Sequence, residues 1–248
     1  METVWEWFRW LDKAHGIDLS VFYDTGDRHR FLMGFLTTIL LSVTCLVSSL
    51  AIGFIGAWAQ QSRFRPARLA VSAFIQFFRN TPPLVQLYFF YFAIGGMLPK
   101  LADASGMASP IFGSFFWAAV SLSLFGGAFN IEIFRAGIEA VPRATIEAAE
   151  SLGFSKGQIF RLVAFPLALR FSLRALNNNM VNLVKTTSLA YAIGVPELLY
   201  VSAQIWSDQL NAREMMTLLL FSYVGLVGAM VWGMHRLERA LRMPGYGQ

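Results

Sequence analysis

Charged side chains are scarce in this sequence of 248 residues, since Asp, Glu, Lys and Arg together make up only 14% of it. An ordinary soluble domain carries about 25% charged residues. Hydrophobic residues are correspondingly abundant, at 56%, and the mean hydropathy is +0.51. This composition excludes an ordinary soluble domain and indicates a protein of the membrane.

Cysteine and histidine are almost absent as well. The single cysteine, Cys45, lies in an apolar run, which excludes an intrachain disulfide and a cysteine-based metal site and favours a packing role. The three histidines are too scattered for a metal site. There is no Gly-x4-Gly-Lys-Ser/Thr phosphate loop and no His-Glu-x-x-His segment. We therefore expect no catalytic residue, metal or cofactor in this chain. If ATP drives its function, another chain binds the nucleotide.

The formal net charge of +5 raises the alternative of a nucleic-acid-binding protein. The basic residues, however, lie in short segments between apolar runs, and no nucleic-acid-binding motif accompanies them. Basic loops between apolar spans are typical of the cytoplasmic side of membrane proteins. We therefore expect no nucleic-acid partner and use the basic loops at residues 63–68 and 135–174 to assign topology.

Apolar runs without a charged residue occupy residues 31–59, 111–131 and 215–234. Each reaches the roughly 20 residues that a helix needs to cross the hydrocarbon core. A further apolar region, residues 69–98, is interrupted at residues 79–83 by Arg-Asn-Thr-Pro-Pro. Proline lacks a backbone N–H donor and restrains the residue before it, so we expect a helix break there. Such a break is tolerated in a membrane only beside protein or a water-filled cavity.

The run at residues 175–196 is less apolar, because it contains four asparagines and Lys185. Its polar residues are spaced by three or four positions, so they share one helix face that we expect to look inward, away from lipid. These residues are Asn178, Asn182, Lys185 and Ser188. We count this run as the fourth of five spans, because the basic C-terminal end must lie on the same side as the other basic loops. The segment around Glu197 and Asp208 is then an external loop.

The sequence thus predicts an all-α membrane protein with five transmembrane helices, an external N-terminus and a cytoplasmic C-terminus. In residues 1–30, clustered tryptophans predict a short helix at the membrane surface. Six acidic residues there argue against a cleavable signal peptide, so the first span would serve as its own insertion signal. We expect residues 31–240 to form one transmembrane domain and residues 241–248 to form a cytoplasmic tail.

A small polar segment separates the third and fourth spans. Pro142 predicts the start of a helix and Gly153 its end. Ser155 and Gln158 then have the spacing of a capping box, which predicts a second short helix that Pro166 closes. The segment 142–166 should form a helix-turn-helix elbow on the cytoplasmic side.

Two interpretations of this elbow remain open on the residues alone. Ala148 and Ala149 are small enough to let it sit deep in the groove of a partner protein, where Glu147 could pair with a basic residue. Alternatively, the elbow is a connector packed on its own chain.

The spacing within the elbow resembles the cytoplasmic signature of the membrane permease subunits of bacterial ATP-binding cassette (ABC) importers. That signature is Glu-Ala-Ala, three residues, Gly, nine residues, then an aliphatic residue, any residue, Leu and Pro. The matching positions in this chain are Glu147, Ala148, Ala149, Gly153, Val163 and Pro166. Phe165 stands where Leu is usual, and Ala144-Thr145 stands where Gly-Gln usually precedes the signature.

Further segments resemble the polar amino acid branch of these importers. Residues 79–86 are similar to its Arg-Gly-Thr-Pro-Leu-Leu-Val-Gln segment, with Asn80 for Gly and Pro83 for Leu. Residues 185–189 resemble its Lys-Asp-Thr-Ser-Leu segment, and the Glu-x-x-Arg-x-Gly-Ile pattern at residues 132–138 also fits. The resemblance covers roughly residues 31–240.

This resemblance implies that the chain is a noncatalytic, multi-pass subunit of the bacterial inner membrane, with residues 1–30 at its periplasmic side. The elbow would be a coupling helix that docks into a separate ABC ATPase dimer, which would hold ATP and Mg²⁺. A second permease chain, identical or a sibling, would complete the path through the lipid. A periplasmic binding protein would deliver the substrate.

Polar residues within spans are the candidates for the substrate path, because burying ionisable groups in a membrane is costly and usually functional. The candidates are Lys185, Thr187, Ser188, Asn182, Arg79, Thr81 and Gln86. Alternatively, Arg79 or Lys185 pairs with Glu132 or reaches an interface, and only stabilises the bundle. Both cations would suit a carboxylate, and the resemblance at residues 79–82 points to glutamate, glutamine, aspartate or asparagine as substrate.

Two other functional classes remain as alternatives. A secondary transporter or channel driven by an ion gradient would use intramembrane carboxylates, yet Glu132 is the only acidic residue near the interior of a span. The sequence gives no support for a membrane-embedded enzyme or scaffold, because it shows no group of residues that could act as nucleophile, general base or metal site.

Overall fold

The computed structural model describes residues 2–102 and 108–240, which form two compact units. Unit 1 comprises Met1–Thr44, Leu84–Ser121 and Val184–Gly228. Unit 2 comprises Cys45–Pro83, Leu122–Leu183 and Ala229–Gln248. The expected tail at residues 241–248 lies outside the described residues.

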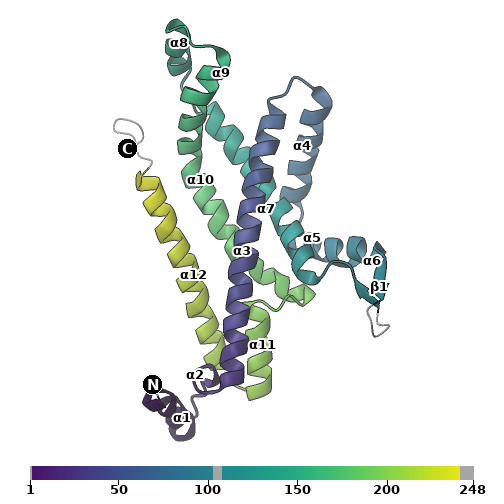
Figure 1. Cartoon of the computed structure of the whole chain (residues 1–248), viewed down its shortest axis with the longest axis vertical. Coiled ribbons are helices and arrows are strands. Elements are labelled where there is room, and N and C mark those ends of the chain that lie inside the picture. The colour runs from purple at the N-terminus through teal and green to yellow at the C-terminus, as the bar shows by residue number, and fades with distance from the viewer. Residues whose placement is uncertain (1, 103–107, 241–248) are drawn as a thin grey trace. The chain divides into compact units, whose positions relative to one another are not determined.

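Three helices in the described part of the chain are long and apolar enough to cross a membrane (Figure 1). They are α3 (Thr25–Gln60), α7 (Ser114–Glu139) and α12 (Ala212–Ala240). Helices α3 and α12 contain the charge-free runs at residues 31–59 and 215–234, and α7 contains all but the first three residues of the run at 111–131. The prediction of long apolar helices is therefore confirmed for these three.

The expected break in the second apolar region is confirmed. Helix α4 (Arg65–Asn80) ends where Thr81 takes an extended conformation, with φ −112° and ψ 142°. Helix α5 (Pro83–Tyr88) begins at the second proline and continues through a π-helical segment, η1 (Phe89–Ile94), into α6 (Gly95–Met97). A proline in the first turn of a helix loses no hydrogen bond, which is why α5 can begin there.

The expectation that Pro166 closes a short helix is wrong. After the elbow helices α8 (Arg143–Ser151) and α9 (Lys156–Ile159), the chain passes through a π-helical segment, η2 (Phe160–Ala164), into α10 (Phe165–Thr186). The chain stays helical through η2, and the wider turn of this π-helical segment departs from the regular i→i−4 hydrogen bonds, so it accommodates the missing N–H of Pro166. The helix expected at residues 175–196 therefore begins earlier, and a 3₁₀ segment, η3 (Thr187–Ile193), follows it.

The remaining elements are short. Helices α1 (Glu2–His15) and α2 (Ser20–Tyr23) precede α3. The segment expected as an external loop contains a helix, α11 (Leu198–Gln209). Strands β1 (Lys100–Ala102) and β2 (Ala108–Pro110) pair antiparallel, so the fold is mostly helical rather than purely helical.

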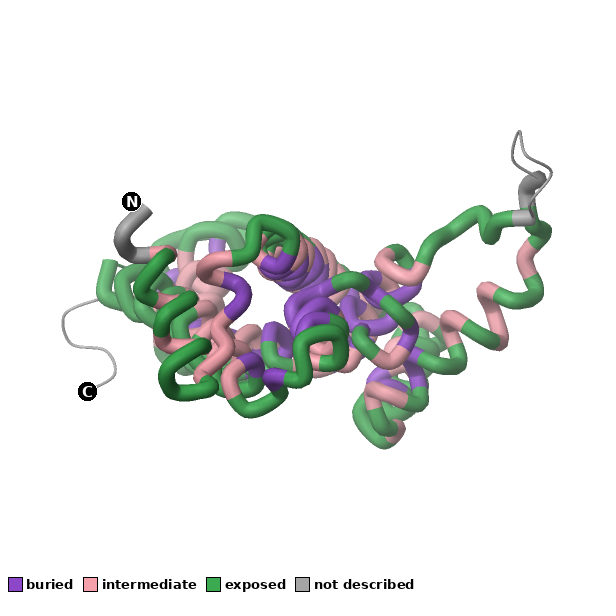
Figure 2. Tube along the Cα trace, turned by 90° about the horizontal axis from the view of Figure 1, so that it is seen from below, coloured by how far each residue is buried: buried purple, intermediate pink, exposed green. Residues whose placement is uncertain are grey.

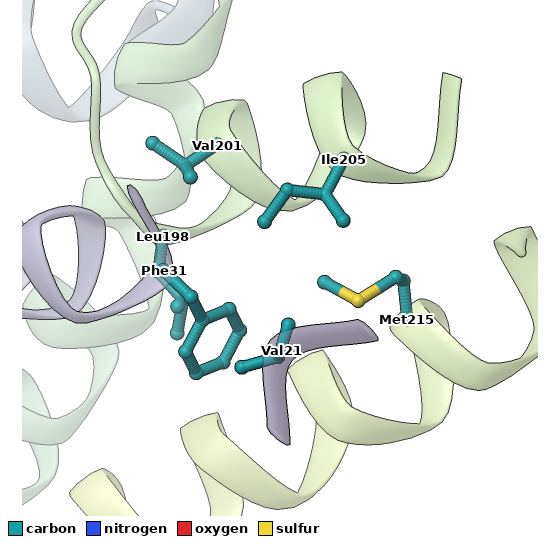
Figure 3. Close-up of a cluster of buried hydrophobic side chains, with 6 residues drawn as sticks. All are labelled: Val21, Phe31, Leu198, Val201, Ile205 and Met215. Atoms are coloured by element: carbon teal, nitrogen blue, oxygen red, sulfur yellow. The ribbon is translucent and has the colours of Figure 1, made fainter. Parts of the chain in front are cut away.

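The core of unit 1 joins helices that lie far apart in the sequence. Six buried side chains from α2, α3, α11 and α12 form this core (Figure 3): Val21, Phe31, Leu198, Val201, Ile205 and Met215. Gly34 of α3 allows α11 to approach closely, because a Cβ there would lie 3.0 Å from the Val201 side chain. Moving each such large side chain out of water into this core contributes about 1.5–3 kcal/mol to the free energy of folding.

In unit 2, α3 and α7 approach closely through small residues. A Cβ on Gly53 or Gly56 would clash with Asn130 or Ile131 of α7. Close contact of this kind through glycine is a common way for helices to associate in membranes.

A buried polar network crosses this packed region of unit 2. Asn179 Nδ2 of α10 donates to Asn130 Oδ1 at 2.8 Å and to the Gly126 carbonyl oxygen at 3.1 Å. Asn130 Nδ2 in turn donates to Ser49 Oγ at 3.2 Å. The network satisfies polar groups that would otherwise be costly in an apolar interior.

Exposed residues are frequent along the helices, as Figure 2 shows in green. In the apolar part of α12 only 6% of residues are buried, compared with 61% in α7.

Substituting Asn179 by Ala should lower the free energy of unfolding by about 1 kcal/mol, because its loss leaves Asn130 without its donor. Asn178 is exposed on the same helix, so Asn178→Ala serves as the matched control and should change stability by less than about 0.5 kcal/mol. Denaturation of the purified protein in detergent measures both. Equal effects of the two substitutions would contradict the role of the network.

Candidate coupling and transport site

The first helix of the elbow, α8, ends in a Schellman motif in unit 2. The Phe154 N–H donates to the Ala149 carbonyl oxygen at 3.2 Å, and the Gly153 N–H donates to that of Glu150 at 2.9 Å. Gly153 has φ +81°, in the left-handed region that glycine adopts without strain. The local geometry thus explains why glycine is needed at this position.

The second elbow helix begins with the predicted capping box. Ser155 Oγ accepts from the Gln158 N–H at 3.4 Å, and the Ser155 N–H donates to Gln158 Oε1 at 2.8 Å. These reciprocal bonds satisfy backbone donors that a helix start leaves without partners. Figure 1 shows α8 and α9 beyond the N-terminal end of α10.

The elbow has one face packed on its own chain and one exposed face. Ala149 is 5% exposed, so it faces the chain itself, whereas Ala148 is exposed. That these small residues let the elbow sit deep in the groove of a partner stays a prediction. Val163 packs against the buried residues Val141 and Leu167, and Pro166 is partly buried. Glu147, Ala148 and Gly153 are exposed.

Large apolar residues also remain exposed on the elbow. Leu152 is 76% exposed and Leu162 is 59% exposed. These exposed leucines and the exposed Glu147 give the elbow both apolar contact area and a charge.

Arg79 is held by two partners within unit 2. It pairs with Glu132 of α7, and its guanidinium lies 5.2 Å from the centre of the Phe129 ring. The alternative that Arg79 pairs with Glu132 is therefore confirmed by the geometry. The pair borders an open cleft of about 370 Å³ whose wall includes small residues of α7, such as Ala136 and Gly137.

The other candidates at the broken helix have local roles. Thr81 Oγ1 donates to the Phe77 carbonyl oxygen at 2.7 Å and so caps the end of α4 in unit 2. Gln86 lies on α5 in unit 1 and is only 3% exposed.

The polar residues around the end of α10 differ in access. Asn182 and Lys185 are exposed, and the Lys185 ammonium forms no ion pair within the described residues. Ser188 Oγ donates to the Lys185 carbonyl oxygen at 2.9 Å and is partly exposed. Thr187 is fully buried, and its hydroxyl donates to the Val184 carbonyl oxygen at 2.7 Å. Lys185 and Ser188 are therefore accessible, whereas Thr187 is not.

Glu197 is a buried polar residue whose structural role the sequence did not reveal. Its side chain is fully buried, caps α11 by accepting from the N–H groups of Leu199 and Tyr200, and accepts from the Tyr223 hydroxyl at 3.0 Å. Burial raises the pKa of the Glu197 carboxyl, and these hydrogen bonds act in the opposite direction. The only sequence signal was an acidic residue before an apolar run, and glutamate is not a preferred capping residue.

Comparison with known protein families identifies the class. The family of the binding-protein-dependent transport system inner membrane component matches residues 49–243, and this chain belongs to that family. Such permeases are normally noncatalytic membrane subunits that work with an ATPase and a substrate-binding protein. The residues that matched the cytoplasmic signature lie within this range.

Curated relatives place the chain among amino acid permeases. The permease HisQ of Escherichia coli, from a histidine/lysine/arginine/ornithine transport system, is 30% identical over 167 residues, covering 67% of this chain and 73% of HisQ. The E. coli glutamate/aspartate import permease GltJ is 28% identical over 251 aligned positions, covering 99% and 98%. The probable glutamine ABC transporter permease GlnM of Bacillus subtilis is 27% identical over 225 residues, covering 91% and 98%.

Solved structures agree with this assignment. A crystal structure of an amino acid ABC transporter with histidines has a TM-score of 0.75 and 26% identity, covering 86% of this chain and 94% of that chain. The inward-facing MetNI methionine ABC transporter has a TM-score of 0.70 at 20% identity, covering 89% and 100%, which shows the shared fold.

This chain is thus the permease subunit of an amino acid ABC importer. Its family membership favours ATP-driven import over the ion-gradient, enzyme and scaffold alternatives.

Replacing Gly153 by Ala should weaken the end of α8 by about 1 kcal/mol, because alanine is strained at a left-handed φ. Gly157 in α9 has equally open space around a Cβ but an ordinary helical φ, so Gly157→Ala is the matched control and should stabilise the elbow slightly. Hydrogen exchange over residues 143–159 measures both. Unchanged exchange in Gly153→Ala would contradict the Schellman cap.

Proposed function

We propose that this chain couples a separate ABC ATPase dimer to the import of glutamate, glutamine, aspartate or asparagine through the elbow at residues 142–166. The observation that carries this proposal is the exposed face of α8. Glu147 and Ala148 are exposed there, while Ala149 and Val163 anchor the elbow to its own chain. A helix that is packed against its own chain on one face can transmit a movement that a partner imposes on its exposed face. ATP and Mg²⁺ would bind to the ATPase subunits.

The proposed topology has five spans, a periplasmic N-terminus and a cytoplasmic C-terminus. Support comes from the three long apolar helices, with α10 and the broken run α4–α6 as the other two spans. Basic loops at residues 63–68 and 135–174 would then lie in the cytoplasm, as the distribution of Lys and Arg in membrane proteins requires.

A second permease chain, identical or a sibling, would complete the transport path. Asn178, Asn182 and Lys185 are exposed at helical spacing on α10. Polar residues of this kind are costly in contact with lipid, so they favour a second chain or a water-filled path beside them. A periplasmic binding protein would deliver the substrate to this path.

The proposed substrate class rests on charge. Glu132 neutralises Arg79, so Lys185 is the accessible cation of the candidate path. A cation there would attract the carboxylate of an acidic amino acid and repel a basic one. The names of the relatives GltJ and GlnM, which concern glutamate, aspartate and glutamine, agree with this choice. The name of HisQ concerns histidine, lysine, arginine and ornithine, so basic amino acids are a second candidate class of substrate.

Glu147→Arg should abolish ATP-dependent uptake while leaving the protein in the membrane, because it reverses a charge on the exposed face of α8. Glu6→Arg makes the same charge change on an exposed position of α1, at the proposed opposite side of the membrane, and should preserve uptake. Vesicle uptake and pull-down of the ATPase measure the effect. Normal uptake by Glu147→Arg would refute the coupling role.

Lys185→Met should reduce glutamate or glutamine uptake by about tenfold or more, the loss typical of one charge-assisted hydrogen bond. Lys185→Arg keeps the charge and should restore much of the rate. Uptake of labelled amino acids, with unlabelled arginine and histidine as competitors, tests both the residue and the substrate class. Similar activity of the Met and Arg variants would contradict a role for the charge.

A further inference from the structure

An open cleft of about 430 Å³ lies within unit 1, between the start of α3, the end of η3 and the helix α11. It combines a cation, an anion and aromatic rings. The lining residues that carry these groups are Arg30, Asp208, Tyr191, Tyr200 and Trp206. None of them belongs to the candidate path or to the coupling elbow.

The cation of this cleft is the guanidinium of Arg30, and a buried carboxylate holds it in place. Arg30 pairs through Nη2 with Asp27, a carboxylate that is 1% exposed. Asp27 Oδ2 also accepts from Gln209 Nε2 at 3.0 Å, and the Asp27 N–H donates to Asp24 Oδ1 at 2.8 Å. A buried carboxylate held in this way positions the guanidinium. The N–H groups of Arg30 that do not bond to Asp27 stay available for other acceptors.

The anion of the cleft is placed beside this cation. Arg30 Nη1 donates to Asp208 Oδ2 at 2.8 Å. Within the described residues, Asp208 Oδ1 accepts no hydrogen bond, so this oxygen is open to a ligand. The guanidinium likewise keeps N–H donors beyond those used for Asp27 and Asp208.

Aromatic rings form another part of the wall. The Tyr191 and Tyr200 rings lie 5.9 Å apart at 55°, and Trp206 also lines the cleft. Aromatic faces attract ammonium groups and pack against apolar side chains. An ordinary exposed ion pair needs neither these rings nor a buried carboxylate behind its cation.

We propose that this cleft binds the zwitterionic end of a free amino acid, with the ligand carboxylate on Arg30 and its ammonium group on Asp208. Opposite charges on neighbouring side chains match the two charges that every free amino acid carries on one carbon. This inference rests on the proposed function, because it makes the cleft a periplasmic receiving site of the importer under the proposed topology.

The test uses the complete permease–ATPase complex in lipid nanodiscs, without a binding protein. Glutamine and glutamate are titrated while the intrinsic tryptophan fluorescence, to which Trp206 contributes, is followed. Saturable binding is expected. Glutaramic acid, which lacks the α-ammonium group, and 4-aminobutanamide, which lacks the α-carboxylate, should each bind about tenfold more weakly or worse than glutamine.

Asp208→Asn is the principal variant, since its side chain is 56% exposed and its loss should not disturb folding. It should weaken glutamine binding by about tenfold or more and raise the KM for uptake. Arg213→Gln is the matched control. It breaks a different exposed ion pair, with Glu214, outside the cleft, and should leave binding unchanged.

Several outcomes would overturn the proposal. One is the absence of binding by the wild-type complex, and another is equal affinity of glutamine and its two charge-deleted analogues. Unchanged binding in Asp208→Asn combined with lost uptake would assign the surface to docking of the binding protein instead. Failure of the proposed function looks different, because the wild-type importer itself would then show no ATP-dependent uptake of these amino acids.

Discussion

Polar groups within the apolar layer of a membrane must find partners inside the protein, and this constraint explains much of the structure. Unit 2 meets it with the Asn130–Asn179 network and with the pair of Arg79 and Glu132. Outside the predicted spans, in unit 1, the buried side chain of Glu197 is satisfied in the same way, because it caps α11 and accepts from Tyr223. Lys185, by contrast, is exposed and forms no ion pair in the part of the chain that the structure describes.

Features set by nearby residues were predictable from the sequence. The break after Asn80, the capping box at Ser155 and the helix end at Gly153 depend on backbone geometry within a few positions, and all three appear in the structure. The long apolar helices followed from composition alone. Pro166 was misjudged, because a π-helical segment whose presence no simple pattern reveals shifts the proline into a tolerated position.

Features set by distant residues were not predictable. Glu197 has its hydroxyl partner, Tyr223, in another helix, so its burial has no local signal. Ala148 and Ala149 are adjacent and chemically identical, yet only the second faces its own chain, because a helix turns each successive residue by about 100°. The ion pair of Arg79 with Glu132 was predicted only as an alternative to a role in the substrate path, because the sequence does not show which charged residues meet in space.

In the elbow, the residues whose interactions determine its fold differ from the residues that are exposed on its surface. Its shape depends on the Schellman bonds at Gly153, the capping box at Ser155 and the packing of Val163. The side chains of Glu147, Ala148 and Leu152 take no part in these bonds or in this packing, and they are exposed. Substitutions on the outer face therefore leave the bonds that fold the elbow intact, so the surface of this segment can diverge among related chains while its shape is kept.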